Sequence, residues 1–252
     1  MLKIGLSGCN GKMGRVITSI VDNINDVQIV FGVSKTVDKY ENSYKVYSDT
    51  DEIKEICDVV IDFSSVDNLE NILKYCLRNN TPIVIATTGF NREEENYIKT
   101  TSQKIAILKT TNTSVGVNLI LELAKLATNA LYGDFDIEIV EKHHNQKVDA
   151  PSGTAKTIAS TINKELENNM KYNYGRNEIG KRDKNEIGMH AIRGGSIVGE
   201  HTIIFAGEDE IIEIKHEALS KAIFAKGAIK ASRYMKDKTS GMYNMQDLIN
   251  NI

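Results

Sequence analysis

Two histidines, a lysine and a predicted helix start lie close together in the middle of this chain. The segment from residue 141 to residue 155 has the sequence EKHHNQKVDAPSGTA. His143 and His144 are adjacent, so on an extended chain their side chains point to opposite sides and are poorly placed to share a metal ion. Because histidine titrates near neutral pH, either ring can act as a general acid or base. Lys147 follows His143 by four residues and can supply a proton or a positive charge.

The same segment ends in the start of a predicted helix. Pro151 fixes the entry to that helix, and Ser152 is a natural N-cap. Gly153 and Thr154 would present backbone N–H groups and a hydroxyl, which together suit a carboxylate at the positive end of a helix. Ser152 is a weaker candidate for a hydrolase nucleophile, because neither a GxSxG nor an SxxK pattern surrounds it. We therefore predict an acid/base site that binds an anionic substrate.

A glycine-rich turn near the start of the chain has the features of an anion-binding site. A predicted strand runs into GCNGKMG at residues 8–14. Residues without a Cβ let backbone N–H groups approach a pyrophosphate, and the next helix points its positive end at the same anion. The spacing is GxxGxxG, so the GxGxxG dinucleotide fingerprint is only partly met, and no P-loop sequence is present. The turn predicts nucleotide binding; the alternative is a turn that merely joins a strand to a helix.

Ser34 and Lys35 follow the second predicted strand, where a dinucleotide-binding protein usually holds the adenine ribose with Asp or Glu. Here no carboxylate sits at that point to repel a 2′-phosphate, and Lys35 can pair with one. We expect NADPH to be used well; the alternative is that Lys35 is a solvated loop lysine.

The elements around these residues fall into two patterns. The first half alternates apolar strands with amphipathic helices, which predicts a parallel sheet covered by helices on both faces. The second half predicts an α+β domain whose last strands follow one another as a meander, with a polar, mobile loop at residues 168–188. A final helix from about residue 221 returns to the first domain. We predict a dinucleotide-binding domain at residues 1–113 and 224–252, and a second domain at residues 114–223. The predicted strands cover residues 2–6, 27–33, 58–63, 82–86, 105–108, 136–140, 191–197, 200–206 and 211–215.

Composition narrows the class of protein. The chain has 252 residues, of which 41% are hydrophobic, and a net charge of −3, which argues against a general nucleic-acid or membrane-surface binder. Its apolar runs are far shorter than the ~18–20 residues of a transmembrane helix. Three widely spaced cysteines suit reduced thiols in the cytoplasm, and no zinc spacing occurs. We expect a cytoplasmic protein without a metal, a membrane or a nucleic-acid partner.

The histidine segment resembles the signature of the dihydrodipicolinate reductase family, also called 4-hydroxy-tetrahydrodipicolinate reductases. The resemblance extends along essentially the whole chain. It includes IGLSGCNGKMG at residues 4–14, VVIDFSS at 59–65, ATTGF at 86–90, TNTSVGVN at 111–118, IVGEHTIIFAGEDEIIEIKHEA at 197–218 and FAKGA at 224–228.

The resemblance implies an α/β protein with a Rossmann-like dinucleotide-binding domain and a central α+β domain that binds substrate and builds a homotetramer. It implies NADPH- or NADH-dependent reduction of 4-hydroxy-tetrahydrodipicolinate to tetrahydrodipicolinate, in the diaminopimelate route to lysine. The reductant would deliver hydride to C4 of an unsaturated ring dicarboxylate, and a proton would follow at the neighbouring carbon.

The resemblance also implies roles for individual residues. His143 would be the acid/base residue and Lys147 the proton donor, while His144, Ser152, Gly153 and Thr154 would bind the substrate carboxylates. The cofactor would be bound by Gly8, Cys9, Asn10, Gly11, Lys12, Met13, Ser34, Lys35, Ala86, Thr87, Thr88, Thr110, Thr111, Asn112 and Thr113. Three positions depart from the family pattern. Ser34 replaces a frequent acidic residue, and Ala86 and Thr113 replace the usual Gly of GTTGF and Phe of NFSVG.

Two other functions remain open from the sequence. A non-catalytic NAD(P)H-binding sensor would need the glycine turn but not His143 and Lys147. A related dehydrogenase would act on the carbonyl of an amino-acid semialdehyde. A metal hydrolase fits least, because the adjacent histidines lack the i, i+4 spacing of a zinc site.

Overall fold

The chain divides into two compact units. The computed structural model describes residues 1–177 and 179–251. One unit is Met1–Val115 with Ala222–Ile252, and the other is Gly116–Lys221. The divisions expected from the sequence, after residue 113 and before residue 224, each lie two residues from these. The candidate residues of the glycine turn lie in the first unit, and those of the histidine segment lie in the second.

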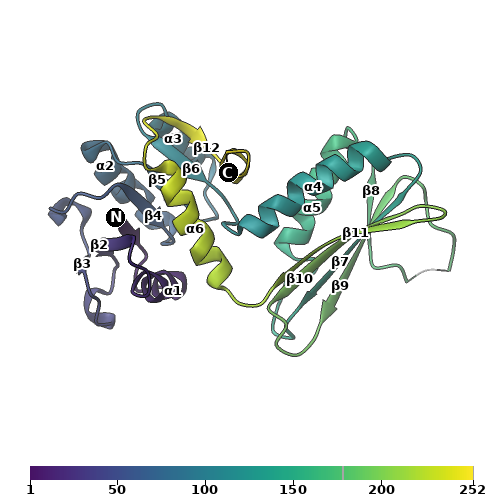
Figure 1. Ribbon diagram of the computed structural model, residues 1–252, viewed down its shortest axis with the longest axis horizontal. Coiled ribbons are helices and arrows are strands. Elements are labelled where there is room, and N and C mark those ends of the chain that lie inside the picture. Colours follow the sequence, from purple (N-terminus) through teal and green to yellow (C-terminus); the bar gives the residue numbers. More distant parts are fainter. Residues whose placement is uncertain (178, 252) are drawn as a thin grey trace. The chain divides into compact units, whose positions relative to one another are not determined.

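The first unit is built on a parallel seven-stranded sheet (Figure 1). Its strand order is β12-β6-β5-β4-β1-β2-β3, and every adjacent pair is parallel. The order reverses at β1, which lies between β2 and β4, so that this sheet has the switch point of a doubly wound fold. The strands are β1 (Leu2–Ser7), β2 (Val27–Val33), β3 (Lys45–Tyr47), β4 (Val59–Asp62), β5 (Ile83–Ile85), β6 (Ala106–Lys109) and β12 (Gly241–Tyr243).

Helices cover both faces of this sheet, as the sequence predicts. Val59 and Ile61 of β4 belong to one apolar core, and Val60 between them belongs to the other. Successive side chains of a strand point to opposite faces, so a strand buried on both sides is apolar throughout. The first core is closed by α1 (Lys12–Val21), α6 (Ala222–Met235) and α7 (Met245–Ile249), and the second by α2 (Leu69–Asn79) and α3 (Arg92–Ser102).

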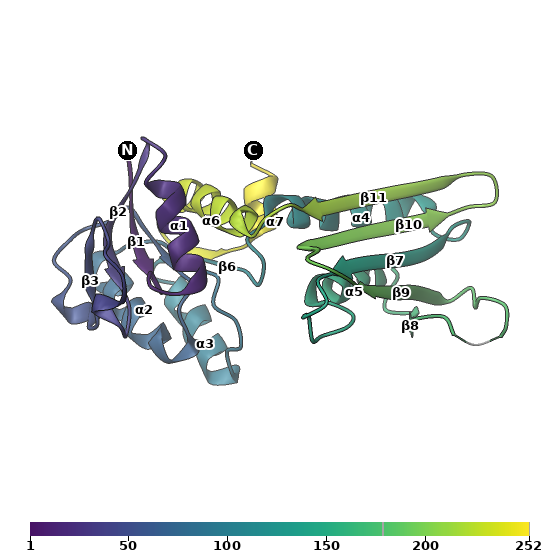
Figure 2. The same ribbon diagram turned by 90° about the horizontal axis from the view of Figure 1, so that it is seen from below.

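The second unit is a five-stranded mixed sheet with helices on one face (Figure 2). Its order is β11-β10-β7-β9-β8. Ile137 and Ile139 of the central strand pack into the core with α4 and α5. The elements are α4 (Val115–Leu131), β7 (Asp136–His143), α5 (Gly153–Glu165), β8 (Lys171–Tyr174), β9 (Glu186–Arg193), β10 (Gly199–Ala206) and β11 (Ile211–Ala218).

The expected meander of the last three strands is wrong. β10 and β11 form an antiparallel pair, but β7 lies between β10 and β9, and β9 runs parallel to β7. The physical reason is burial: the apolar inward row of β7 is fully covered only in the centre of the sheet. The strand expected at residues 191–197 also begins earlier, at Glu186, and ends at Arg193.

The polar segment expected to be a loop at residues 168–188 contains β8, which pairs with β9. Two arginines in the described part of this segment form ion pairs with the sheet. Arg182 contacts Asp136 at 2.8 Å and Glu138 at 3.0 Å, and Arg176 pairs with Glu186. The expectation of a loop therefore fails for β8, since charge pairs and a parallel partner strand order residues that apolar periodicity does not reveal.

Candidate active site

The glycine turn between β1 and α1 is shaped for a close ligand. Gly8 has a φ of +79°, and a Cβ there would lie 2.5 Å from the carbonyl oxygen of Phe63. A Cβ on Gly14 would collide with the carbonyl oxygen of Gly8. The turn itself is closed by the Gly11 N–H, which donates to Gly8 O at 2.9 Å. Only glycine fits at Gly8 and Gly14 without displacing backbone.

The start of α1 suits an anion. Its N-cap, Gly11, offers no side-chain acceptor, and the first turn carries no acidic residue. The first N–H groups of a helix need a partner, and they attract negative charge. The turn also lies after β1 at the switch point, where doubly wound sheets bind nucleotides. The residues present therefore fit the pyrophosphate of a dinucleotide.

Neighbouring loops at the same edge of the sheet carry the other residues expected at the cofactor. Asn10 joins the turn to the loop after β2, because its amide donates to Thr36 O at 2.6 Å and to Val37 O at 3.2 Å. Ala86, Thr87 and Thr88 follow β5, and residues 110–113 follow β6. In the latter loop the Thr113 hydroxyl donates to Phe224 O at 2.7 Å, which links the loop to α6.

A buried carboxylate organises two of these loops. Asp62, at the end of β4, accepts the hydroxyl of Ser64 at 2.6 Å and that of Thr87 at 2.7 Å. Burial raises the pKa of Asp62, although these hydrogen bonds act in the opposite direction. The Thr87 hydroxyl, expected at the cofactor, is thus engaged by Asp62 within the protein.

The loop after β2 brings an unexpected carboxylate to Lys35. The Lys35 ammonium lies 3.0 Å from Asp67, and both side chains are about three-quarters exposed, at 74% and 73%. The sequence did not indicate this pairing, because Asp67 is 32 positions away from Lys35. An exposed pair of this kind is weak, about 0–1 kcal/mol. Lys35 is therefore available to a phosphate, but with a competing acid beside it.

In the second unit, β7 ends in a tightly bonded histidine. His143 is 9% exposed, and its Nδ1 lies 2.6 Å from Oε2 of Glu141, which is 1% exposed. Arg193 donates from Nη1 to Oε2 of Glu141 at 2.8 Å and from Nη2 to Oε1 at 2.7 Å. Burial favours a high pKa for Glu141, but the hydrogen bonds from Arg193, His143 and the Ser152 N–H outweigh it and hold the pKa low.

Ser152 caps α5 as the sequence predicts. Its hydroxyl oxygen accepts the Ala155 N–H at 3.2 Å, and it also contacts Nε2 of His201 at 2.9 Å. Burial, followed by the neighbouring His143, lowers the pKa of His201 to about 4, so this ring is neutral near pH 7. Ser152 is buried, whereas Gly153 at the first turn of the helix is exposed.

Lys147 is paired with a carboxylate rather than with His143. Its ammonium lies 2.7 Å from Oδ1 of Asp149. This hydrogen bond is the main cause of the lowered pKa of Asp149, and the backbone of Gly153 also contributes. His144 is half-buried, and its carbonyl accepts the Lys147 N–H at 3.1 Å. One carboxylate thus already lies among the residues expected to bind a substrate carboxylate.

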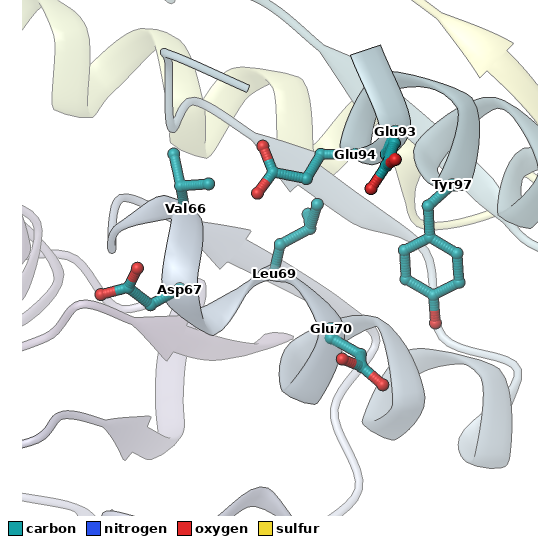
Figure 3. Close-up of a pocket in the computed structure, with 7 residues that line it drawn as sticks. All are labelled: Val66, Asp67, Leu69, Glu70, Glu93, Glu94 and Tyr97. Atoms are coloured by element: carbon teal, nitrogen blue, oxygen red, sulfur yellow. The ribbon is translucent and has the colours of Figure 1, made fainter. Parts of the chain in front are cut away.

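An acidic hollow of about 400 Å³ lies elsewhere in the first unit, between the start of α2 and α3 (Figure 3). Four carboxylates surround it, so it repels the phosphates of a nucleotide. The lining residues are Val66, Asp67, Leu69, Glu70, Glu93, Glu94 and Tyr97.

Among residues 1–177 and 179–251, no group of three or more His, Cys, Asp and Glu side chains is arranged to hold a metal ion. No helix in the described part of the chain is long and apolar enough to cross a membrane.

Sequence reasoning missed three residues that surround His143: Glu141, Arg193 and His201. One feature of the sequence could have indicated Glu141. On β7 it follows Ile137 and Ile139 at alternate positions, so it points to the buried face, where a carboxylate needs a partner. Arg193 and His201 are 52 and 49 positions from the groups they contact, and no local pattern indicates them.

The chain matches family models over nearly its whole length. Residues 2–113 match "Dihydrodipicolinate reductase, N-terminus", and residues 116–249 match "Dihydrodipicolinate reductase, C-terminus". It is 51% identical over 250 residues to the 4-hydroxy-tetrahydrodipicolinate reductase of Clostridium tetani, covering 99% of this chain and 98% of the relative. It is 49% identical over 249 residues to that of Clostridium novyi, with the same coverage.

Solved structures agree with this relationship. A dipicolinate-bound dihydrodipicolinate reductase from Paenisporosarcina sp. TG-14 superimposes with a TM-score of 0.80 at 25% identity, over 97% of each chain. A myo-inositol dehydrogenase from Corynebacterium glutamicum has a TM-score of 0.61 at 14% identity, covering 99% of this chain and 93% of the other. The second likeness shows the fold alone.

Proposed function

The chain belongs to the dihydrodipicolinate reductase family, and on that premise we propose how its residues carry out the reaction. The enzyme is an oxidoreductase that uses NAD(P)H to reduce 4-hydroxy-tetrahydrodipicolinate to tetrahydrodipicolinate, in the diaminopimelate route to lysine. The observation that carries the assignment of residues is the buried Glu141–His143 pair beside the start of α5. It joins an acid/base ring to an anion-binding helix end.

The dinucleotide is held by the glycine turn and the loops beside it. Gly8 to Met13 bind the pyrophosphate with backbone N–H groups, assisted by the positive end of α1. Ser34 and Lys35 lie at the adenine ribose, and the loops at residues 86–88 and 110–113 flank the ribose and the nicotinamide. When bound, the cofactor supplies a hydride to the substrate ring.

The second unit binds the dicarboxylate substrate and supplies the groups that transfer a proton. The N-terminus of α5, through Gly153 and Thr154, binds one substrate carboxylate, and His144 and Ser152 assist. His143 exchanges a proton with the substrate, and Lys147 donates one. Asp149 now holds the Lys147 ammonium, so an incoming carboxylate competes with Asp149 for that cation and for the helix end.

The Paenisporosarcina relative is described as bound to dipicolinate, a planar ring dicarboxylate. This supports a small dicarboxylate as the substrate class for the present chain. The cationic groups of residues 142–147 supply the complementary charge in a protein of net charge −3.

Cofactor choice depends on Lys35 and its neighbours. We expect both NADPH and NADH to be used, because Lys35 can pair with a 2′-phosphate while Asp67 partly neutralises it. Replacing Ser34 with Glu should lower kcat/KM for NADPH more than for NADH, since the new carboxylate repels the 2′-phosphate and can accept from a 2′-hydroxyl. Equal losses with the two cofactors would contradict this placement.

The activity is tested by following NADPH and NADH oxidation at 340 nm. The unstable substrate is made in place by the upstream synthase from pyruvate and aspartate semialdehyde. We expect rapid oxidation that depends on the synthase. If the folded protein binds both cofactors but oxidises neither, the result would favour a non-catalytic NAD(P)H-binding sensor over the reductase. Oxidation by an amino-acid semialdehyde without the synthase would indicate the other dehydrogenase.

We also propose that the enzyme is a cytoplasmic homotetramer assembled through the second unit. Helices cover one face of its sheet, and the opposite face carries Ile192 and Ile211, which are 46% and 65% exposed. The same face carries the ion pairs Lys142–Glu200 and His190–Glu138, so it offers exposed isoleucines beside charged groups to another chain. The three cysteines are buried free thiols, as suits a reducing compartment.

A further inference from the structure

A single buried carboxylate connects the two parts of the proposed substrate site. Glu141 accepts from four donors: Nδ1 of His143 at 2.6 Å, two nitrogens of Arg193 at 2.8 and 2.7 Å, and the Ser152 N–H at 3.0 Å. An ionised carboxylate can only accept hydrogen bonds, so each partner must present a proton to it. A bare Nδ1 at this distance would place a lone pair against an anion. His143 therefore carries its proton on Nδ1 whether the ring is neutral or charged.

We infer that Glu141 is a positioning residue that fixes the Nδ1–H tautomer of His143 and so makes Nε2 the atom through which His143 exchanges a proton with the substrate. This inference rests on the acid/base role proposed for His143. It assigns to Glu141 no contact with the substrate.

The packing around the ring agrees with this assignment. A Cβ on Gly199 would lie 3.1 Å from Nε2 of His143, so the glycine lets the ring occupy this position beside β10. The His201 ring packs edge-on against it, with centroids 5.2 Å apart and planes at 72°. These contacts and the bond to Glu141 restrict rotation of the imidazole.

The charged and titratable groups around His143 come from four elements. Glu141 belongs to β7, Arg193 to β9 and His201 to β10, while Lys147 lies in the following loop. The positive charge of Arg193 balances the negative charge of the Glu141 carboxylate. His201 is neutral near pH 7, because burial lowers its pKa to about 4. Glu141 is the anion that faces Nδ1, whereas the nearby carboxylate of Asp149 pairs with Lys147.

The bond from the Ser152 N–H gives Glu141 a second effect. Ser152 is the N-cap of α5, so the carboxylate that orients the ring also fixes the start of the helix that binds the substrate carboxylate. A change at Glu141 therefore alters the acid/base ring and the carboxylate site together, whereas a change at His143 alters only the ring.

The tautomer can be read directly in the wild-type protein. We expect two-bond ¹⁵N–¹H correlation spectra, with His143 assigned by comparison with His143→Ala, to show a protonated Nδ1 and an unprotonated Nε2 when the ring is neutral. A proton on Nε2 of the neutral ring would overturn the inference. This measurement needs no substrate, so it is separate from any failure of the proposed reductase activity.

Kinetics of Glu141→Gln test the consequence for catalysis. The amide can donate to Nδ1 and favour the wrong tautomer, so we expect kcat to fall on the order of 10²-fold or more. We also expect the same ¹⁵N–¹H spectra of Glu141→Gln to lose the signature of a protonated Nδ1, because no carboxylate then accepts from that atom. Glu141→Asp, which keeps a carboxylate acceptor, should restore kcat and the Nδ1-protonated tautomer in part.

Glu186→Gln is the matched control. Glu186 is also a buried glutamate paired with an arginine in this sheet, but it lies at the start of β9 and contacts Arg176. We expect its kcat and its His143 tautomer to match wild type. A loss of kcat in Glu141→Gln with Nδ1 of His143 still protonated would mean that Glu141 is merely structural. If Glu141→Gln does not fold, the wild-type tautomer still decides.

Discussion

At the scale of single residues, two buried carboxylates behave differently because of their partners. Asp62 accepts from hydroxyl groups, so its burial is not offset and its pKa is raised. Glu141 is also buried, but a guanidinium provides two of its hydrogen bonds, and its pKa is lowered. Asp62 can organise neutral hydroxyls near the cofactor loops, whereas Glu141 remains an anion that can orient a histidine.

His143→Ala and Lys147→Ala each remove a group proposed to move a proton. We expect kcat to fall by ~10²–10⁴-fold in each, the range typical of general acid–base catalysis. Lys156→Ala, on the exposed face of α5, is the control and should keep wild-type kcat in the coupled reductase assay. Wild-type kcat in both active-site variants would refute the assigned roles.

His201 makes the stability of the protein depend on pH. Its pKa falls from 6.5 to about 4 on folding, mainly through burial, so the unfolded chain takes up a proton that the folded chain resists. The contribution of the neutral His201 ring to the free energy of unfolding is fully present above pH 6.5 and is lost as the pH falls toward 4. It amounts to about 3 kcal/mol. Relative to His201→Gln, the wild type should lose stability over this range in urea unfolding. Parallel pH curves for the two proteins would contradict this.

At the scale of elements, the site depends on how strands end. Ile137 and Ile139 of β7 pack into the core. Glu141 and His143 follow on the same face of this strand, so the strand that builds the core also positions the acid/base pair. β1 passes directly into a turn whose glycines let the start of α1 approach the ends of β1 and β4. In both cases a regular element fixes the position of a short, chemically active segment.

Gly14→Ala tests the close approach at the first turn of α1. Alanine favours a helix by about 1 kcal/mol over glycine, but here its Cβ would collide with the backbone at Gly8. We expect a net loss of about 1–3 kcal/mol in stability and weaker NADPH binding, measured by thermal unfolding and by titration. Gly180→Ala, with open space around its Cβ, is the control and should change neither. An equal response in the two variants would argue against a tight turn.

At the scale of the whole molecule, the open face of the second sheet is the surface proposed for assembly. Ile211→Glu places a charge on that face, whereas Leu126→Glu places one on an exposed position of α4 on the helix-covered side. We expect Ile211→Glu to sediment as a smaller species than the wild-type tetramer, with Leu126→Glu unchanged. The reverse result would move the interface to α4. A wild-type monomer would refute the tetramer.

The local pattern of the sequence was sufficient for much of this protein. Apolar strands alternating with amphipathic helices predict the parallel sheet, and the GCNGKMG turn predicts the anion site, because both depend on residues near one another in the chain. The Ser152 cap and the histidine segment are also local features, and the structure confirms the cap.

Only the tertiary structure decided the partners of those residues. It placed β7 between β9 and β10, which no periodicity indicates, and thereby brought Arg193 and His201 to Glu141, His143 and Ser152. It likewise brought Asp67 to Lys35. The physical reason is that strand order follows from burying the inward row of a whole sheet. The pattern of one strand says which side chains point inward, but only the completed sheet determines which of them meet.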